Sequence, residues 1–187
     1  MRRIVDLESI QLEAGDHAPD SKYCVMELVA YVSGEPWSDH PECVSSVIAT
    51  FLRSWNDSLN DEDRNLLKQF VEPVIDTVGT EADEQKRAWM CVDWMVRVFA
   101  PEFLRLAKLT DHADKLALLP ELTNTQIALE HQATIAAARA AAGDAAGAAA
   151  GAAAWAAAGA AAGAALEPTV KALQVSAHGV FRRMIAA

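Results

Sequence analysis

Two cysteines, a histidine and several carboxylates lie between Cys24 and Cys43, in the segment CVMELVAYVSGEPWSDHPEC. Thiolate, imidazole and carboxylate groups are the side chains that bind zinc in proteins. Cys24, His40 and Cys43, joined by Cys91 from a later helix, could therefore form a zinc site. The segment has no C-x-x-C pair, however, and His40 with Cys43 is its one close pair. We interpret the cysteines as small core residues and predict no metal site.

The same segment offers a carboxylate pair, Glu27 and Glu35, that could carry out acid–base chemistry. Nothing in the sequence places a nucleophile or an oxyanion donor beside this pair, and Glu35 and Asp39 lie where turns need capping hydrogen bonds. The chain has no P-loop, G-x-G-x-x-G, G-x-S-x-G or H-E-x-x-H motif. We therefore predict no catalytic residue and no cofactor, and favour a non-enzymatic protein. A small metal-binding protein or enzyme built on the Cys24–Cys43 segment stays open as the alternative.

A second pattern lies between Ala140 and Leu166, where five glycines and a tryptophan share one four-residue spacing. Alanine is the best helix former and glycine one of the worst, so this stretch predicts a helix with a repeated defect along one line. Such a line indicates close contact with another helix, in the same chain or in a second chain. The predicted interaction residues are Gly143, Gly147, Gly151, Trp155, Gly159 and Gly163. The alternative is a repeat expansion that gives a neutral spacer helix.

The spacing of these glycines, called the glycine row below, decides the geometry of such a contact. Four residues advance about 40° around an α-helix, so the row drifts and follows the ridge that joins residues four apart. Packing along that ridge gives a steep helix crossing. Each glycine costs about 1 kcal/mol relative to alanine, so the row would weaken the helix unless packing compensates.

The net charge of −10 is unevenly distributed, because residues 1–131 carry −12 and the remainder carries +2. A body this acidic repels phosphate backbones, so we predict no direct binding to nucleic acid. The charge suits a basic protein instead, such as a nucleic-acid-binding protein whose groove the chain could occupy.

Cysteine usage and hydropathy bear on location. Three cysteines and an N-terminus without an apolar segment are typical of a reduced, cytoplasmic protein. Residues 145–166 carry no charge and are numerous enough to cross a bilayer. Alanine and glycine contribute little apolar transfer energy, which disfavours a membrane helix. A membrane-associated helix pair stays open as a further alternative.

Apolar periodicity and capping residues predict an all-α fold, with a compact acidic helical bundle followed by a long Ala/Gly-rich helix and a C-terminal return helix. The long helix is expected from Thr123 or Asn124 to Ala165, and Pro168 in the first turn of the return helix. The helices expected in the bundle span residues 23–33, 38–55, 60–79, 82–99, 101–106 and 110–119. The expected domains are an N-terminal arm (1–21), the bundle (22–120) and the long and return helices (121–187).

Two blocks resemble a known group of proteins. The first is MELVAYVSGEPWSDHPEC with the later FLRSWND, and the second is QKRAWMCVDWMVRVFAPEFLRLAKL, residues 85–109. Both are similar to an uncharacterised family of small helical proteins found in actinobacterial genomes and their phages. The resemblance covers about half of the chain and implies a helical, soluble protein carried by mobile elements. It implies no activity, cofactor or site residue.

These observations together predict a non-enzymatic protein for protein–protein interaction or assembly. The expected contact is with a protein partner, or with a second copy through the Ala/Gly helix. A phage-related variant of this hypothesis is an acidic inhibitor of a host nucleic-acid-binding protein.

Overall fold

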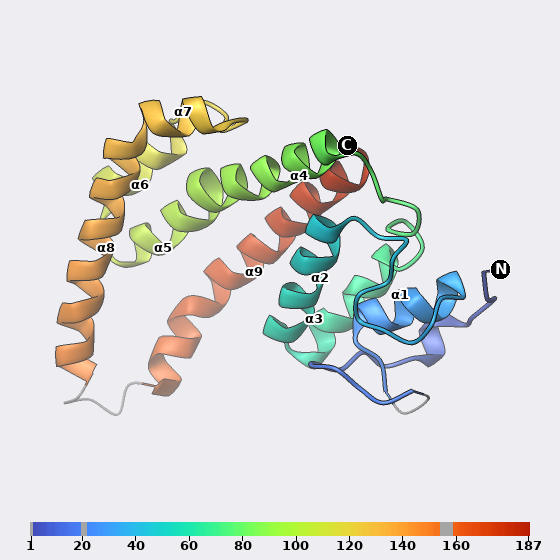
Figure 1. Ribbon diagram of the computed structural model, residues 1–187. Helices are drawn as coiled ribbons and strands as arrows, with labels where there is room; N and C mark the ends of the chain where they lie inside the picture. The colour runs from blue at the N-terminus through green and yellow to red at the C-terminus, as the bar shows by residue number, and fades with distance from the viewer. Residues whose placement is uncertain (1, 20–21, 154–158) are drawn as a thin grey trace. The chain divides into compact units, whose positions relative to one another are not determined.

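The computed structural model describes residues 2–19, 22–153 and 159–187, and these are almost entirely helical or in loops (Figure 1). Within these ranges the sole β pairing is an isolated bridge between Leu12 and Tyr23. The predicted all-α fold is confirmed.

The chain divides into two compact units. Unit 1 comprises Met1–Arg87 with Met184–Ala187, and unit 2 comprises Ala88–Arg183. The division differs from the expected boundary near residue 120, because it falls inside helix α4 (Glu81–Trp94). The first turns of α4 belong to unit 1, and the rest of the helix belongs to unit 2.

Unit 1 is built from short helices, and a side chain caps the N-terminus of each of its three complete α-helices among the described residues. Its elements are α1 (Val25–Ser33), α2 (Ser46–Ser58), α3 (Asp61–Asn65) and a 3₁₀ helix (Leu66–Phe70). Asn60 caps α3 as predicted, because its side-chain oxygen accepts the Asp63 amide. Gly34 ends α1 with a φ of 85°, a left-handed conformation that favours glycine.

The second helix was predicted to start at Ser38 or Asp39, and this prediction is wrong. Ser45 is the N-cap of α2, and the preceding loop is fixed by Glu35. The two carboxylate oxygens of Glu35 accept the backbone amides of Glu42 and Cys43 at 2.7 and 2.9 Å. These side-chain bonds satisfy backbone donors that a helix would otherwise use, so the loop is stable in place of a helical turn.

The N-terminal residues, expected to form a separate arm, are part of unit 1. The Asn65 side chain accepts the Leu12 amide at 3.1 Å, and Asn56 donates to the Glu13 carbonyl at 2.9 Å. Leu12 itself is fully buried. Two amide side chains on α2 and α3 thus hold the arm against the unit 1 core.

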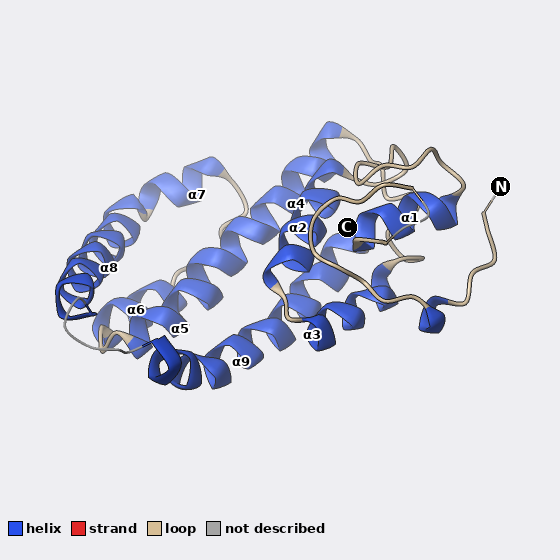
Figure 2. Cartoon of the chain, turned by 90° about the horizontal axis from the view of Figure 1, so that it is seen from below, coloured by secondary structure: helices blue, strands red, loops and turns tan. Residues whose placement is uncertain are grey.

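In its described residues, unit 2 contains one long helical run and four further helices (Figure 2). In the run, α4 passes without a loop into a π-helical segment and then into α5. The elements are the π segment (Met95–Phe99), α5 (Ala100–Leu106), α6 (Thr110–Ala117), α7 (Thr125–Glu130), α8 (Gln132–Ala153) and α9 (Gly159–Ile185).

Two expectations about the C-terminal third are corrected. The long helix does not run unbroken from Asn124, because His131 leaves helical geometry, with φ −107° and ψ 7°, between α7 and α8. Pro168 lies inside α9 and not in its first turn. Alanine has the highest helix propensity, and the turns before Pro168 are rich in it. The helix therefore continues past Pro168, although proline lacks a backbone N–H and leaves one helical hydrogen bond unmade. Residues 154–158, within the predicted long helix, lie outside the described residues.

The described core of unit 2 is small and built around α6. Leu104, Leu116, Leu119 and the alanines Ala113 and Ala138 are buried together, on α5, α6, the loop after α6, and α8. Farther along, the Trp94 indole on α4 donates to the Ser176 hydroxyl on α9 at 2.8 Å, and both views draw these helices side by side (Figures 1 and 2).

A carboxylate from α4 caps α2 within unit 1. One oxygen of Glu84 accepts the Ser45 hydroxyl, the Ser46 hydroxyl and the Val47 amide at 2.8 to 3.1 Å. The other oxygen accepts from Arg87, a buried side chain that also donates to the carbonyls of Thr77 and Met184. Partial burial acts to raise the pKa of Glu84, but these hydrogen bonds outweigh it and hold the pKa below 4.5.

We expect the Glu84→Gln variant to lose about 1–2 kcal/mol of the free energy of unfolding at neutral pH. A carboxylate with a lowered pKa stabilises the fold above the pKa of the unfolded chain, and that contribution is lost as the pH falls through the folded pKa. Urea unfolding below pH about 5 should therefore show a shallower acid-induced loss in Glu84→Gln than in the wild type. Glu72→Gln, an exposed change in the same unit, is the control, and equal pH profiles for all three proteins would contradict the role of Glu84.

Candidate binding site

The carboxylates that could carry out acid–base chemistry in the Cys24–Cys43 segment form hydrogen bonds that stabilise the fold. Glu27 is buried, and its carboxylate accepts the amides of Cys24 and His17 at 2.7 and 2.6 Å. It also lies 2.9 Å from Nδ1 of His17. Glu35 fixes the loop before α2, as described above. The two carboxylates of the acid–base alternative therefore accept hydrogen bonds from backbone amides, with turn bonds at Glu35 as expected.

The residues of the alternative zinc site are not brought together. Across the described ranges, which include Cys24, His40, Cys43 and Cys91, no group of three or more histidine, cysteine or acidic side chains could hold a metal ion. His40 lies instead 2.5 Å from the neighbouring carboxylate of Asp39.

All three thiols are held in their protonated form. Burial raises the pKa of Cys24 to about 12 and that of Cys91 to about 11. Partial burial, followed by the hydrogen bond to Glu35, raises the pKa of Cys43. The thiolate is the nucleophile and the metal ligand, so these environments oppose both roles.

A polar cavity of about 210 Å³ in unit 1 includes Cys24 in its wall. Its arginine is already used, because Arg53 donates to the Asp39 carbonyl at 2.9 Å and to the Thr50 hydroxyl at 3.3 Å. Asp57 accepts the Gly15 amide at 2.9 Å. These partners are internal, so the cavity is a solvated part of the fold's own hydrogen-bond network.

The glycine row is only partly described. A Cβ atom placed on Gly143 would meet nothing within 4 Å, so no close contact within the chain requires glycine at this position. Gly147 and Gly151 fall in α8, and Gly159 and Gly163 fall in α9, but the surroundings of all four lie outside the described residues. Trp155 also lies outside the described residues.

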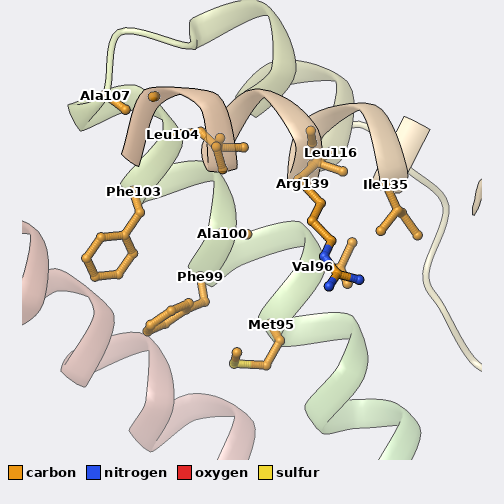
Figure 3. A pocket seen from close by; sticks show the side chains of 13 residues that line it. Met95, Val96, Phe99, Ala100, Phe103, Leu104, Ala107, Leu116, Ile135 and Arg139 are labelled. Carbon is orange, nitrogen blue, oxygen red and sulfur yellow. The ribbon is translucent and has the colours of Figure 1, made fainter. Parts of the chain in front are cut away.

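Unit 2 contains an apolar pocket that the sequence did not predict. Its volume is about 620 Å³, and it lies among the π segment, α5, α6 and α8 (Figure 3). The described residues in its walls are apolar except for one arginine. The lining residues are Met95, Val96, Phe99, Ala100, Phe103, Leu104, Ala107, Leu116, Ile135, Ala138, Arg139, Ala142 and Ala145.

One wall consists of two rows with a four-residue spacing. Met95, Phe99, Phe103 and Ala107 form the first row, and Val96, Ala100 and Leu104 form the second. On a regular α-helix each such step would turn about 40° away from the pocket. A π turn holds more residues than an α turn, so the π segment offsets part of this drift and keeps both rows on one face. The Ala100 amide donates to the Met95 carbonyl, five residues earlier, which is the hydrogen bond that defines this geometry.

Proline explains why the helix departs from α geometry here. Pro101 has no backbone N–H, and its ring clashes with the carbonyl four residues earlier in a regular α-helix. Departures from regular geometry are common beside such a proline. The sequence predicted a fresh helical turn starting at Pro101, whereas the structure continues the helix by widening the turn before it.

The opposite wall comes from α8 and is made of small residues. Ala138, Ala142 and Ala145 face the pocket together with Ile135, at spacings that place them on one side of the helix. Gly143 follows Ala142 by one residue and so points about 100° away. The alanines of α8, and not the glycine row, therefore make this surface.

The π segment is anchored on its far side by a charged pair. Asp93 is largely buried and accepts two bonds from Arg97, at 2.5 and 2.8 Å, and one from the Leu122 amide at 2.8 Å. Arg97 also donates to the Leu119 carbonyl. On the pocket side, Phe99 packs against Trp94 and Phe103, with ring centroids 5.4 and 4.9 Å apart. The pocket wall is thus held from both sides.

The two units differ sharply in charge. Unit 1 has eight lysine and arginine residues against eighteen acidic residues, whereas unit 2 has eight of each. The whole net charge of −10 therefore belongs to unit 1. An anionic ligand is repelled by the net charge of unit 1 but not by that of unit 2.

Comparison with protein-family models, with curated proteins and with solved structures found no match. In the described part of the chain, none of the helices has the length and apolar character needed to cross a membrane.

We expect the thiols to react slowly with iodoacetamide in the native protein at neutral pH. A thiol with a pKa of about 12 has only about one thiolate in 10⁵ molecules at pH 7. Mass spectrometry of peptides should show Cys24 labelled last, and urea-unfolded protein, the control, should label rapidly at all three positions. A Cys24 that reacts faster in the native than in the unfolded protein would support the enzyme alternative instead.

Proposed function

We propose that this chain is a non-enzymatic binding protein whose unit 2 pocket takes an apolar small molecule. One observation carries the proposal, namely a preformed apolar pocket of about 620 Å³ on the π segment. Ligand sites are typically concave, largely apolar and of about 300–1,000 Å³, with a few polar groups. π-helical turns inside α-helices also occur frequently at functional sites.

The energetics of the apolar walls support a ligand. Met95 is 46% exposed although it lines the pocket, and several neighbouring lining residues are only half-buried. Covering apolar surface gains about 25 cal/mol per Å², so an apolar molecule in the pocket would be stabilised by removing these side chains from water. The polar atoms that could oppose such binding are nearly absent from the walls.

A bulky side chain on the α8 wall tests the proposal. We expect Ala142→Trp to fill the pocket and to weaken binding of the neutral fluorescent probe N-phenyl-1-naphthylamine by at least about tenfold, because the indole and the probe compete for one volume. Ala140→Trp is the matched control, since Ala140 lies on the exposed side of the same helix.

Binding is measured by fluorescence titration, with the helical circular dichroism of each variant as the check on folding. An unchanged probe affinity in folded Ala142→Trp would overturn the assignment of the pocket, as would wild-type protein that binds no probe.

A second candidate function, self-association through the glycine row, is favoured by the open space beside Gly143. A second helix could approach the backbone there without displacing any group of this chain. We expect Gly143→Leu to leave the fold intact, because leucine is the better helix former and finds room. If the row is an interface, the added side chain should lower the mass in solution measured by light scattering, and an unchanged mass at high concentration would contradict assembly along the row.

The uneven distribution of charge also indicates which unit would act in the proposed acidic inhibitor. A basic groove of a nucleic-acid-binding protein would be met by unit 1, because that unit carries the whole excess of carboxylates. This partner and the phage relationship are proposals that rest on charge and on the sequence resemblance.

A further inference from the structure

We propose that the ligand of the unit 2 pocket is a single-chain amphiphile with a carboxylate head group, of the fatty acid class, and that Arg139 binds the carboxylate. The inference rests on the proposed binding function and names the class of ligand. It is carried by the position and the free charge of Arg139 on an otherwise apolar wall.

Within the described part of the chain, Arg139 differs from the arginines of the π segment and α5 in having no internal partner. Among the described residues, its guanidinium has no carboxylate within ion-pair distance and no hydrogen-bond acceptor. Arg97, in the π segment, is paired with Asp93, and Arg105, in α5, is paired with Glu102 and Asp114. A guanidinium beside an apolar surface, with its donors unused, is available to an external anion.

The arrangement of the pocket suits a molecule with one charged end. Arg139 extends from α8 toward Val96, whereas the rings of Phe99 and Phe103 lie away from it, across Ala100 (Figure 3). A ligand that pairs with Arg139 would therefore place its apolar part over the aromatic rings and the methyl groups of the alanines. The pocket thus has a charged end at Arg139 and an apolar end at the aromatic rings, which match the carboxylate and the alkyl chain of a fatty acid.

The charge on the wall selects a carboxylate. A planar guanidinium donates two parallel hydrogen bonds to a carboxylate, and one arginine neutralises one negative charge. Among the described lining residues Arg139 is the one charged side chain, and none of them would balance a second charge on a phosphate monoester. Unit 2 is neutral overall, so its own charges exert no net repulsion on an anion.

The test compares two ligands of equal chain length, dodecanoic acid and 1-dodecanol, by equilibrium dialysis at mildly alkaline pH and below micelle formation. Wild-type protein should bind the acid about tenfold more tightly than the alcohol, because a charge-assisted bond is added to the same chain contacts. Arg139→Gln should remove this preference, so that the acid binds no more tightly than the alcohol. Arg139→Lys should keep part of the preference, because it retains the charge but not the paired donors.

Arg105→Gln is the matched control, since it removes the same charge from a side chain that is already paired with carboxylates. Equal binding of acid and alcohol by the wild type, or an acid preference that persists in Arg139→Gln, would overturn the head-group assignment and leave the binding function in place. Absence of binding for both ligands, or acid binding that survives Ala142→Trp, would overturn the pocket function itself.

Discussion

The departure from α geometry at Met95–Phe99 is the constraint on which the apolar pocket depends. A four-residue apolar spacing drifts around a regular α-helix, and over the length of this wall the drift would carry Ala107 far from the face of Met95. The π segment offsets that drift and leaves two rows on one side. Because Pro101 removes a hydrogen bond at the same place, the wider turn costs the helix less here than elsewhere.

Unit 1 depends on a different principle, the complete pairing of its buried polar groups. Asn56 has no exposed surface, yet its side chain accepts the Val25 amide and donates to Glu13 and Asp57. In the described residues no buried side-chain nitrogen or oxygen lacks a hydrogen-bond partner. A low local dielectric makes each of these bonds stronger and each missing bond more costly, so the network specifies one arrangement of loop and helix. This explains how a unit with ten excess negative charges holds long loops in place.

Sequence reasoning succeeded where the signal is local. The end of the first helix at residue 33, the helix start at residue 60 and a cap at Thr123 or Asn124 were predicted from residue type, because each signal acts on a neighbouring turn of its own helix. Prediction failed where a residue that is distant in the sequence determines the local structure. The start of α2 depends on Glu84, which lies thirty-nine residues beyond Ser45. The N-terminal residues are likewise held in place by side chains of α2 and α3. No local sequence pattern predicts these contacts.

The sequence did not predict the pocket, because its walls come from helices that are distant in the sequence. One sequence signal of the pocket is nevertheless present. Apolar residues from Met95 to Ala107 repeat every four positions around a proline, a combination that a regular helix cannot place on one face. The glycine row shows a more regular four-residue repeat, but there is open space beside Gly143. On α8 it is alanine that shapes the site, because a methyl group leaves room between helices while the helix keeps its stability. The alanine-rich helix therefore has a use that its glycines do not explain: it provides a thin, stable wall from which a single arginine faces an apolar space.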